Sequence, residues 1–445
     1  MSVLAENSVY TSLNQQGPLA APDSVSLERL CCRRTRDWVA ELRQSELTVT
    51  KYRAVRRQIF EFLNITSFQD IPRLLSDGPA RVDCSRRACR LLGNMFGISG
   101  TEEEIRYRVN EYARTADSVI RSLQSKLFAP YASHVAMTNE VEITTDPVDL
   151  LLMVFDDRYH KKARFEAHRK LSLMSLAGSI DQRERETGSE EKFAQFLTFL
   201  NDYVWSSDQK IGEHDIVYLL SRHTGADFSC SDVSVIRKED VPDITMKQGL
   251  KLTLLKRRRF KVGRRELPIY VSIRKKPPEA KVLKLLRKNE KNPAVAVDDE
   301  LGLMAVLDSA ADVKIFQNHL TQSASNADSF MILEDISDTL TGTLHKATST
   351  GSSTQTPMLK FFARLGGMRV EFIIHTNRSW LNYMYQRDVA HDEYEVKRIF
   401  DSGVAELLFP ASIYYLDHQS VRNNMIRLFR KQIEEAWKWM ENGAG

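Results

Sequence analysis

Apolar and polar residues alternate along several stretches in the second half of the chain. Ile269, Val271 and Ile273 stand at every second position of residues 266–274, which is the period of a β-strand. Residues 250–261 show a similar pattern, and Gly263 between the two stretches predicts a hairpin. Further strands are expected at 228–235, 302–307, 330–333, 358–365 and 368–376. The fold that we expect is α+β, with about five strands in one mixed sheet and helices on its faces.

Helical patterns dominate the first half. Thr101 and Glu104 form a capping box that opens a helix to about residue 126. Residues 211–223 are expected to be helical, and the polar stretch 178–191 is expected to be a loop. The predicted organisation is a flexible tail at 1–22, a helical accessory region at 23–225 with a break near 130–145, an α+β domain at 226–410 and a C-terminal helix within 411–445.

Composition narrows the class of protein. The chain has 445 residues, of which 42% are apolar and 27% charged, as in an ordinary globular protein. Its five cysteines form no CxxC pair, which favours a reducing, cytoplasmic setting. There is no apolar run long enough to cross a bilayer and no signal-peptide pattern at the N-terminus, so we expect no membrane partner.

Cations gather around residues 274–288. Arg274 and Lys276 share one face of a strand, and the prolines that follow are suited to the first turn of a helix. In that helix Lys281, Lys284 and Lys288 recur on one side. Such a cluster is costly unless an anion lies near it, and a polyphosphate is the natural candidate. The alternative is a solvated basic surface.

The hairpin at 251–265 is also strongly basic in its first arm. It could face RNA or another anion, or its charges could protect an exposed sheet edge. The net charge of +4 is too small to imply nucleic-acid binding by itself.

Two carboxylates stand out in the predicted sheet. Asp299 precedes the strand that begins at Gly302, and Glu371 lies in the middle of the strand 368–376, on the same face as His375. The Ser- and Thr-rich stretch 338–357 between them is long for a loop in a compact domain, which makes it a functional candidate.

The order of these motifs resembles the synthetase domain of the RelA/SpoT family, which makes and senses the alarmone (p)ppGpp, over roughly residues 228–400. The matching positions are Arg274, Lys276 and Lys284 of the family's Arg-x-Lys pattern, Asp299 and Gly302 of Asp-x-x-Gly, Val370, Glu371 and Thr376 of Val-Glu-x-Gln-Ile-Arg-Thr, and Ala390, His391 and Tyr394 of Ala-His-x-x-Tyr.

The chain also departs from the family's pattern. Ala280 replaces a serine, the arginine after Gly302 and the glutamine and arginine after Glu371 are missing, and the stretch 338–357 contains no tyrosine. The family's hydrolase domain is not evident upstream. The acceptor therefore stays open between a guanine nucleotide, an adenine nucleotide and an RNA end.

The resemblance implies a Mg²⁺-dependent nucleotidyltransferase, a pyrophosphokinase that moves a pyrophosphate from ATP to an acceptor in a stress response. Arg274, Lys276 and Lys284 would hold the ATP phosphates, and Lys281, His375 and His391 are further candidate substrate-binding residues. Asp299 would hold Mg²⁺, and Glu371 would act as base or second metal ligand.

These assignments predict that Asp299 and Glu371 lie close together, facing Arg274 and Lys276. Two alternatives remain. The domain could be a degenerate nucleotide sensor or nucleic-acid-binding regulator without catalysis. The two acids could instead only neutralise nearby lysines in a structural network.

Overall fold

A computed structural model describes residues 44–206, 214–245, 247, 249–298, 300–340, 356–387 and 390–442. The described chain divides into two compact units, one formed by residues up to 124 together with 131–182, the other by 125–130 and the residues from 183 onward. The predicted α+β class is confirmed. No helix within the described ranges has the length and apolar character that a membrane crossing requires.

The first unit is helical throughout its described part. Its helices are α4 (Glu46–Leu63), α5 (Ile71–Ser76), α6 (Gly78–Met95), α8 (Ala132–Val135), α9 (Asn139–Ile143) and α10 (Pro147–Phe155), with most of α7 (Glu102–Leu127) and α11 (Lys161–Thr187). The predicted capping box is confirmed, since the Thr101 amide donates to the Glu104 carboxylate at 2.7 Å and the Glu104 amide donates to the Thr101 hydroxyl at 3.3 Å. The loop expected at 178–191 is wrong, because α11 and α12 (Ser189–Phe199) occupy it and bury Ile180.

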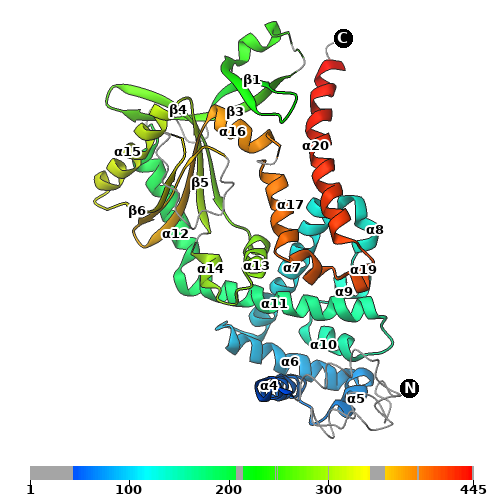
Figure 1. Ribbon diagram of the computed structural model, residues 1–445. Coiled ribbons are helices and arrows are strands. Elements are labelled where there is room, and N and C mark those ends of the chain that lie inside the picture. Colours follow the sequence, from blue (N-terminus) through cyan, green and yellow to red (C-terminus); the bar gives the residue numbers. More distant parts are fainter. Residues whose placement is uncertain are drawn as a thin grey trace. The chain divides into compact units, whose positions relative to one another are not determined.

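The second unit is built on a mixed sheet, shown in Figure 1. Its strands are β1 (Asp215–His223), β2 (Cys230–Arg237), β3 (Leu250–Val262), β4 (Arg265–Lys275), β5 (Leu301–Leu307), β6 (Ile332–Asp338), β7 (Leu359–Leu365) and β8 (Met368–Thr376). Their order is β2-β1-β3-β4-β5-β8-β7-β6, and only the β5–β8 pair is parallel. The described sheet thus has eight strands, more than the five expected.

The helix expected at 211–223 is wrong where the chain is described, because β1 occupies 215–223. The run from Ile216 to Leu220 is apolar at every position, and such a run fits a buried strand as well as a helix. Hydrogen bonds to β2 on one side and β3 on the other settle it as a strand. Both predicted hairpins are confirmed, with the left-handed backbone at Gly263 (φ +60°) and at Gly366 and Gly367 (φ +53° and +78°).

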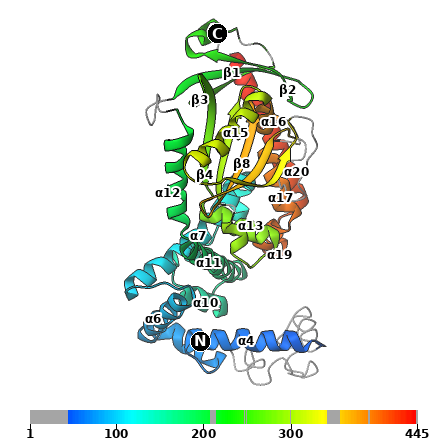
Figure 2. The same cartoon turned by 90° about the vertical axis from the view of Figure 1, so that its left-hand side faces the viewer.

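Helices cover both faces of the sheet. On one face α12, the π-helical turn Leu200–Val204 and α15 (Ala310–Asn326) form the main core with β4, β5, β7 and β8. On the other face α16 (Asn377–Tyr385) packs through Trp380 and Leu381. In Figure 2 α15 lies in front of the sheet, and α17 (His391–Asp401) and α20 (His418–Asn442) lie behind it. Short helices α13 (Pro278–Lys288), α14 (Ala294–Val297), α18 (Val404–Leu408) and α19 (Ala411–Tyr414) complete the described unit.

Candidate functional site

Glu371 is a buried carboxylate in the centre of the sheet, with a side chain only 9% exposed. The Lys360 ammonium on β7 lies 2.9 Å from its Oε1, and the Arg274 guanidinium on β4 lies 3.2 Å from its Oε2. Burial by itself would raise the pKa of Glu371. The charges of Lys360, Lys276 and Arg274 outweigh burial and lower the pKa to about 2. Glu371 is therefore a permanent anion at physiological pH.

The register of three strands explains how Arg274 reaches Glu371. Gly302 on β5 stands directly between Arg274 on β4 and Glu371 on β8. A Cβ atom at Gly302 would lie 3.1 Å from Arg274 Nε and 3.4 Å from Arg274 Cγ. The glycine of the Asp-x-x-Gly motif thus leaves the space in which the arginine side chain crosses β5.

Beside this ion pair lies a pocket of about 260 Å³. Arg274 and Glu371 form its charged end, and Tyr383 of α16 and His391 at the start of α17 form an aromatic side. The remaining lining residues are Ser272, Gly302, Leu303, Met304, Ile373, Met384 and Asp392. Of the predicted site residues, the structure therefore brings Arg274, Glu371 and His391 together in one pocket.

Tyr383 was missed by the sequence analysis. Burial raises the pKa of its phenol to about 12, while the charge of Arg274 opposes this rise. The phenol is therefore neutral and close to the charged end of the pocket. The sequence feature that could have indicated Tyr383 is the group of aromatic residues in the short helix after the strand that carries Glu371.

His375 lies next to Tyr383 and is not part of the pocket lining. It is fully buried, its Nδ1 is 3.3 Å from the Ser379 hydroxyl, and its ring centroid lies 5.3 Å from that of Tyr383. Burial lowers the pKa of His375 to about 4, so the imidazole is neutral. His375 is placed to support Tyr383 and does not line the pocket.

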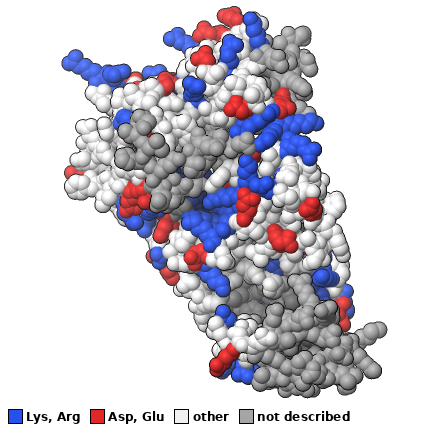
Figure 3. Space-filling view, in the orientation of Figure 1, with Lys and Arg blue, Asp and Glu red and all other residues white. Residues whose placement is uncertain are grey.

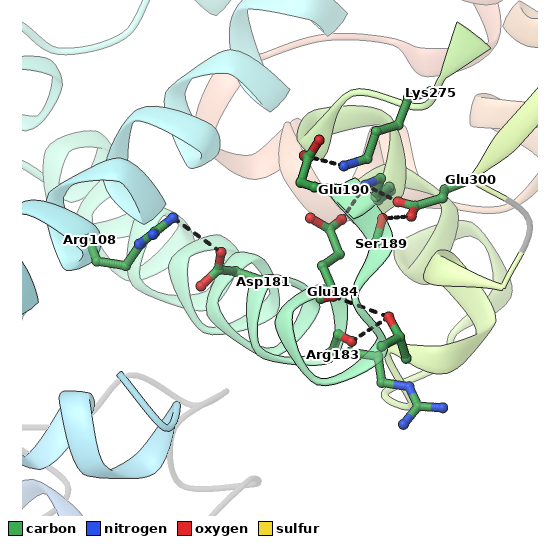
Figure 4. A network of polar contacts seen from close by, with 10 residues as sticks. Arg108, Asp181, Arg183, Glu184, Ser189, Glu190, Lys275 and Glu300 are labelled. Atoms are coloured by element: carbon green, nitrogen blue, oxygen red, sulfur yellow. Dashed lines mark hydrogen bonds and ion pairs between the residues drawn. The ribbon is translucent and has the colours of Figure 1, made fainter. Parts of the chain in front are cut away.

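Lys281 belongs to a buried network with Glu184, Glu300 and Ser189, and Figure 4 labels the last three of these residues. Its side chain is 1% exposed, and its ammonium contacts Glu184 and lies 2.5 Å from Glu300 Oε2. Ser189 at the start of α12 donates a hydrogen bond to the same Glu300 carboxylate. Two carboxylates thus already neutralise Lys281, which does not line the pocket.

Lys284 is also turned inward. It is 7% exposed, and its ammonium donates to the backbone carbonyl of Val295, which joins α13 to α14. Lys276 remains close to the site, because its charge lowers the pKa of Glu371 and its amide donates to the Glu300 carbonyl at 2.9 Å. Of the cations in the predicted phosphate cluster, Arg274 lines the pocket and Lys276 lies near it, whereas Lys281 and Lys284 are buried in the core.

Asp299 lies outside the described residues, as does most of the 338–357 stretch, at 341–355. The expected approach of Asp299 to Glu371 stays a prediction. Within the described ranges no group of three or more His, Cys, Asp or Glu side chains is arranged to hold a metal ion.

The basic hairpin does not present its charges on one side. Arg257 is buried and pairs at 2.7 Å with the exposed Asp308, and Arg259 bonds to Asp215 and Glu266 at 2.6 and 3.1 Å. The Arg258 guanidinium lies over the Trp205 ring, 5.8 Å from its centroid. On the face drawn in Figure 3, acidic side chains lie among the basic ones. Ion pairs therefore neutralise part of the positive charge of residues 251–265, on which the prediction of RNA binding was based. RNA binding by this hairpin stays a prediction.

Comparison with known proteins gives no match to the chain among family models, curated proteins or solved structures.

Proposed function

We propose that the second unit is a divergent pyrophosphokinase of the RelA/SpoT synthetase type, which transfers a pyrophosphate from ATP to a nucleotide or RNA acceptor with Mg²⁺. The observation that carries the proposal is the ionised Glu371, joined to Arg274 across Gly302 at the edge of a pocket. The five cysteines form no CxxC pair, which supports a cytoplasmic setting for this reaction.

In this proposal Arg274 and Lys276 bind the phosphates of ATP. The Arg274 side chain is half exposed, so its guanidinium can turn from Glu371 to a phosphate without leaving the pocket. A negatively charged ligand would thus compete with Glu371 for the same cation. Positioning and charge neutralisation of this kind supply most of the catalysis in phosphoryl transfer.

The geometry favours one of the two roles expected for Glu371. A general base works best when its pKa lies near the operating pH, and a pKa of about 2 is far below it. A permanently ionised carboxylate is instead suited to hold a cation. We therefore propose that Glu371 positions Arg274 and serves as a metal ligand, while another group or solvent accepts the proton of the attacking hydroxyl.

Mg²⁺ is usually held by one or two carboxylates together with substrate phosphates. Glu371 and Asp299 are a donor set of this kind. Both oxygens of Glu371 contact cations, so a metal at Oε1 would have to replace the Lys360 ammonium. Bound there, Mg²⁺ would neutralise phosphate charge.

The test is incubation of the full chain with Mg²⁺ and γ-labelled ATP against GDP, GTP, ADP and bulk tRNA. We expect one acceptor to gain the label as a pyrophosphate, with release of one AMP for each transfer. The same incubation with EDTA should give no transfer. Label on no acceptor, from protein that binds ATP, would contradict the proposal.

Lys360 favours a second candidate, a nucleotide sensor without catalysis. Its ammonium is buried against Glu371, where it already supplies the positive charge that a metal would bring. A sensor would bind nucleotides equally well with EDTA and with Mg²⁺. The pyrophosphokinase should bind ATP more tightly with Mg²⁺.

A further inference from the structure

The pocket has an aromatic wall, which we define as Tyr383 and His391. Their ring centroids are 5.4 Å apart, and both residues line the pocket. The His391 side chain is 43% exposed, whereas the Tyr383 ring also lies 5.3 Å from the buried His375 ring. One ring of the wall is thus fixed by the core and the other is open to solvent.

The wall stands beside the charged end of the same pocket. Arg274 influences the pKa of Tyr383 through its charge, so the guanidinium and the phenol are near each other. Met304, Ile373 and Met384 supply apolar lining between the strands and α16. The pocket thus offers the Arg274 cation to an anionic group and an apolar, aromatic side to a flat group, while Glu371 and Asp392 add negative charge to its lining.

We propose that the aromatic wall binds the base of a nucleotide by stacking on Tyr383, with the phosphates on Arg274. This inference rests on the proposed function, because it names the part of the substrate that this pocket holds. Aromatic side chains stack on any base, since every base has a π-face. The volume of about 260 Å³ is slightly below the range of roughly 300–1,000 Å³ usual for small-molecule sites, so the described pocket holds one nucleotide at most.

Tyr385 offers a matched control on the same helix. Its ring contacts the Lys251 ammonium, 3.5 Å from the centroid, and lies 5.9 Å from the His223 ring. It does not line the pocket. Replacement of Tyr385 tests the loss of a partly buried aromatic ring from α16 without touching the wall.

The experiment is isothermal titration calorimetry on the full chain with AMP, GMP and ribose 5-phosphate. We expect AMP or GMP to bind about fivefold to a hundredfold more tightly than ribose 5-phosphate. Tyr383→Leu should remove this advantage and leave ribose 5-phosphate binding unchanged. Tyr383→Phe, which keeps the ring, and Tyr385→Leu should both retain the advantage.

His391→Ala serves as a second variant that does not depend on core packing, because the His391 side chain is partly exposed. It should weaken AMP or GMP binding and leave ribose 5-phosphate binding unchanged. Equal binding of the sugar phosphate and both nucleotides by the native chain would overturn the inference, as would native nucleotide affinity in folded Tyr383→Leu. Binding of AMP and GMP can be measured whether or not the protein catalyses pyrophosphate transfer. Base-dependent binding without pyrophosphate transfer would therefore reject the proposed reaction and keep the inference.

Discussion

Gly302→Ala tests whether the crossing of Arg274 over β5 matters for function. The added Cβ would stand 3.1 Å from Arg274 Nε, closer than ordinary van der Waals contact, and 3.7 Å from the Glu371 carbonyl oxygen. The backbone on β5 cannot move easily, because β4 and β8 bond to it on both sides. The half-exposed Arg274 side chain is the part that will move.

The effect on folding should be small. An ion pair with one partner half exposed contributes at most about 1 kcal/mol. Replacing glycine by alanine in a compatible conformation stabilises by about 0.4–1 kcal/mol through the unfolded chain. These two effects offset each other, so the free energy of unfolding should change by less than about 1 kcal/mol.

The effect on ligand affinity should be larger. A hydrogen bond to a charged group contributes about 1.5–3 kcal/mol, so a displaced Arg274 should weaken ATP binding roughly tenfold to a hundredfold. Calorimetry with ATP measures the affinity, and urea unfolding measures the stability. Gly225→Ala is the control, because a Cβ at Gly225 meets no atom within 4 Å.

A double variant makes the reasoning refutable. If Gly302→Ala acts through Arg274, it should cause no further loss of ATP affinity in an Arg274→Gln background. Unchanged ATP affinity in the single variant would refute the role of the crossing. An equal additional loss in the Arg274→Gln background would show that the glycine acts by another route.

Other predictions concern the buried charges. Lys281→Met should destabilise the protein by about 3–5 kcal/mol in urea unfolding, because Glu300 stays buried without its cation, while ATP affinity measured by calorimetry stays native. Glu371 has a folded pKa of about 2 against 4.5 unfolded, so its contribution of about 3 kcal/mol is present above pH 4.5 and disappears as the pH falls toward 2. Unfolding at a series of pH values should show a correspondingly shallower acid loss in Glu371→Gln. Lys360→Met should raise the pKa of Glu371, since Lys360 is the strongest of the cations that lower it, so the acid loss in the same titration should be smaller and end at a higher pH.

Periodicity predicted the central strands well because their two faces differ. Ile269, Val271 and Ile273 pack into or against the core, whereas Arg274 lies on the pocket side. The same rule failed at β1, where a run of apolar residues carries no period that separates a strand from a helix. Which strands lie at the edges of the sheet depends on pairing between residues that are far apart in the sequence. A local sequence pattern does not contain this information.

The candidate site was predictable where a motif fixed the register. Glu371 was expected to face Arg274, and the register places Gly302 between these two residues. The burial of Lys281 and Lys284 could not be predicted from the sequence, because a helical repeat does not show which side of the helix faces the core. Their partners come from α11, the segment before β5 and α14, far apart in sequence. Tyr383 enters the pocket only because α16 packs back on the sheet.

The most direct measurement compares AMP release and ATP affinity in the native chain and in Glu371→Gln, with Mg²⁺ and the acceptor that gives transfer. Wild-type protein is predicted to release AMP in step with labelled acceptor. In Glu371→Gln, AMP release should disappear while the protein stays folded and still binds ATP. Equal AMP release in both proteins would contradict the central role of Glu371. Absence of AMP release from the native chain with any acceptor, despite ATP binding, would assign the pocket to a sensor.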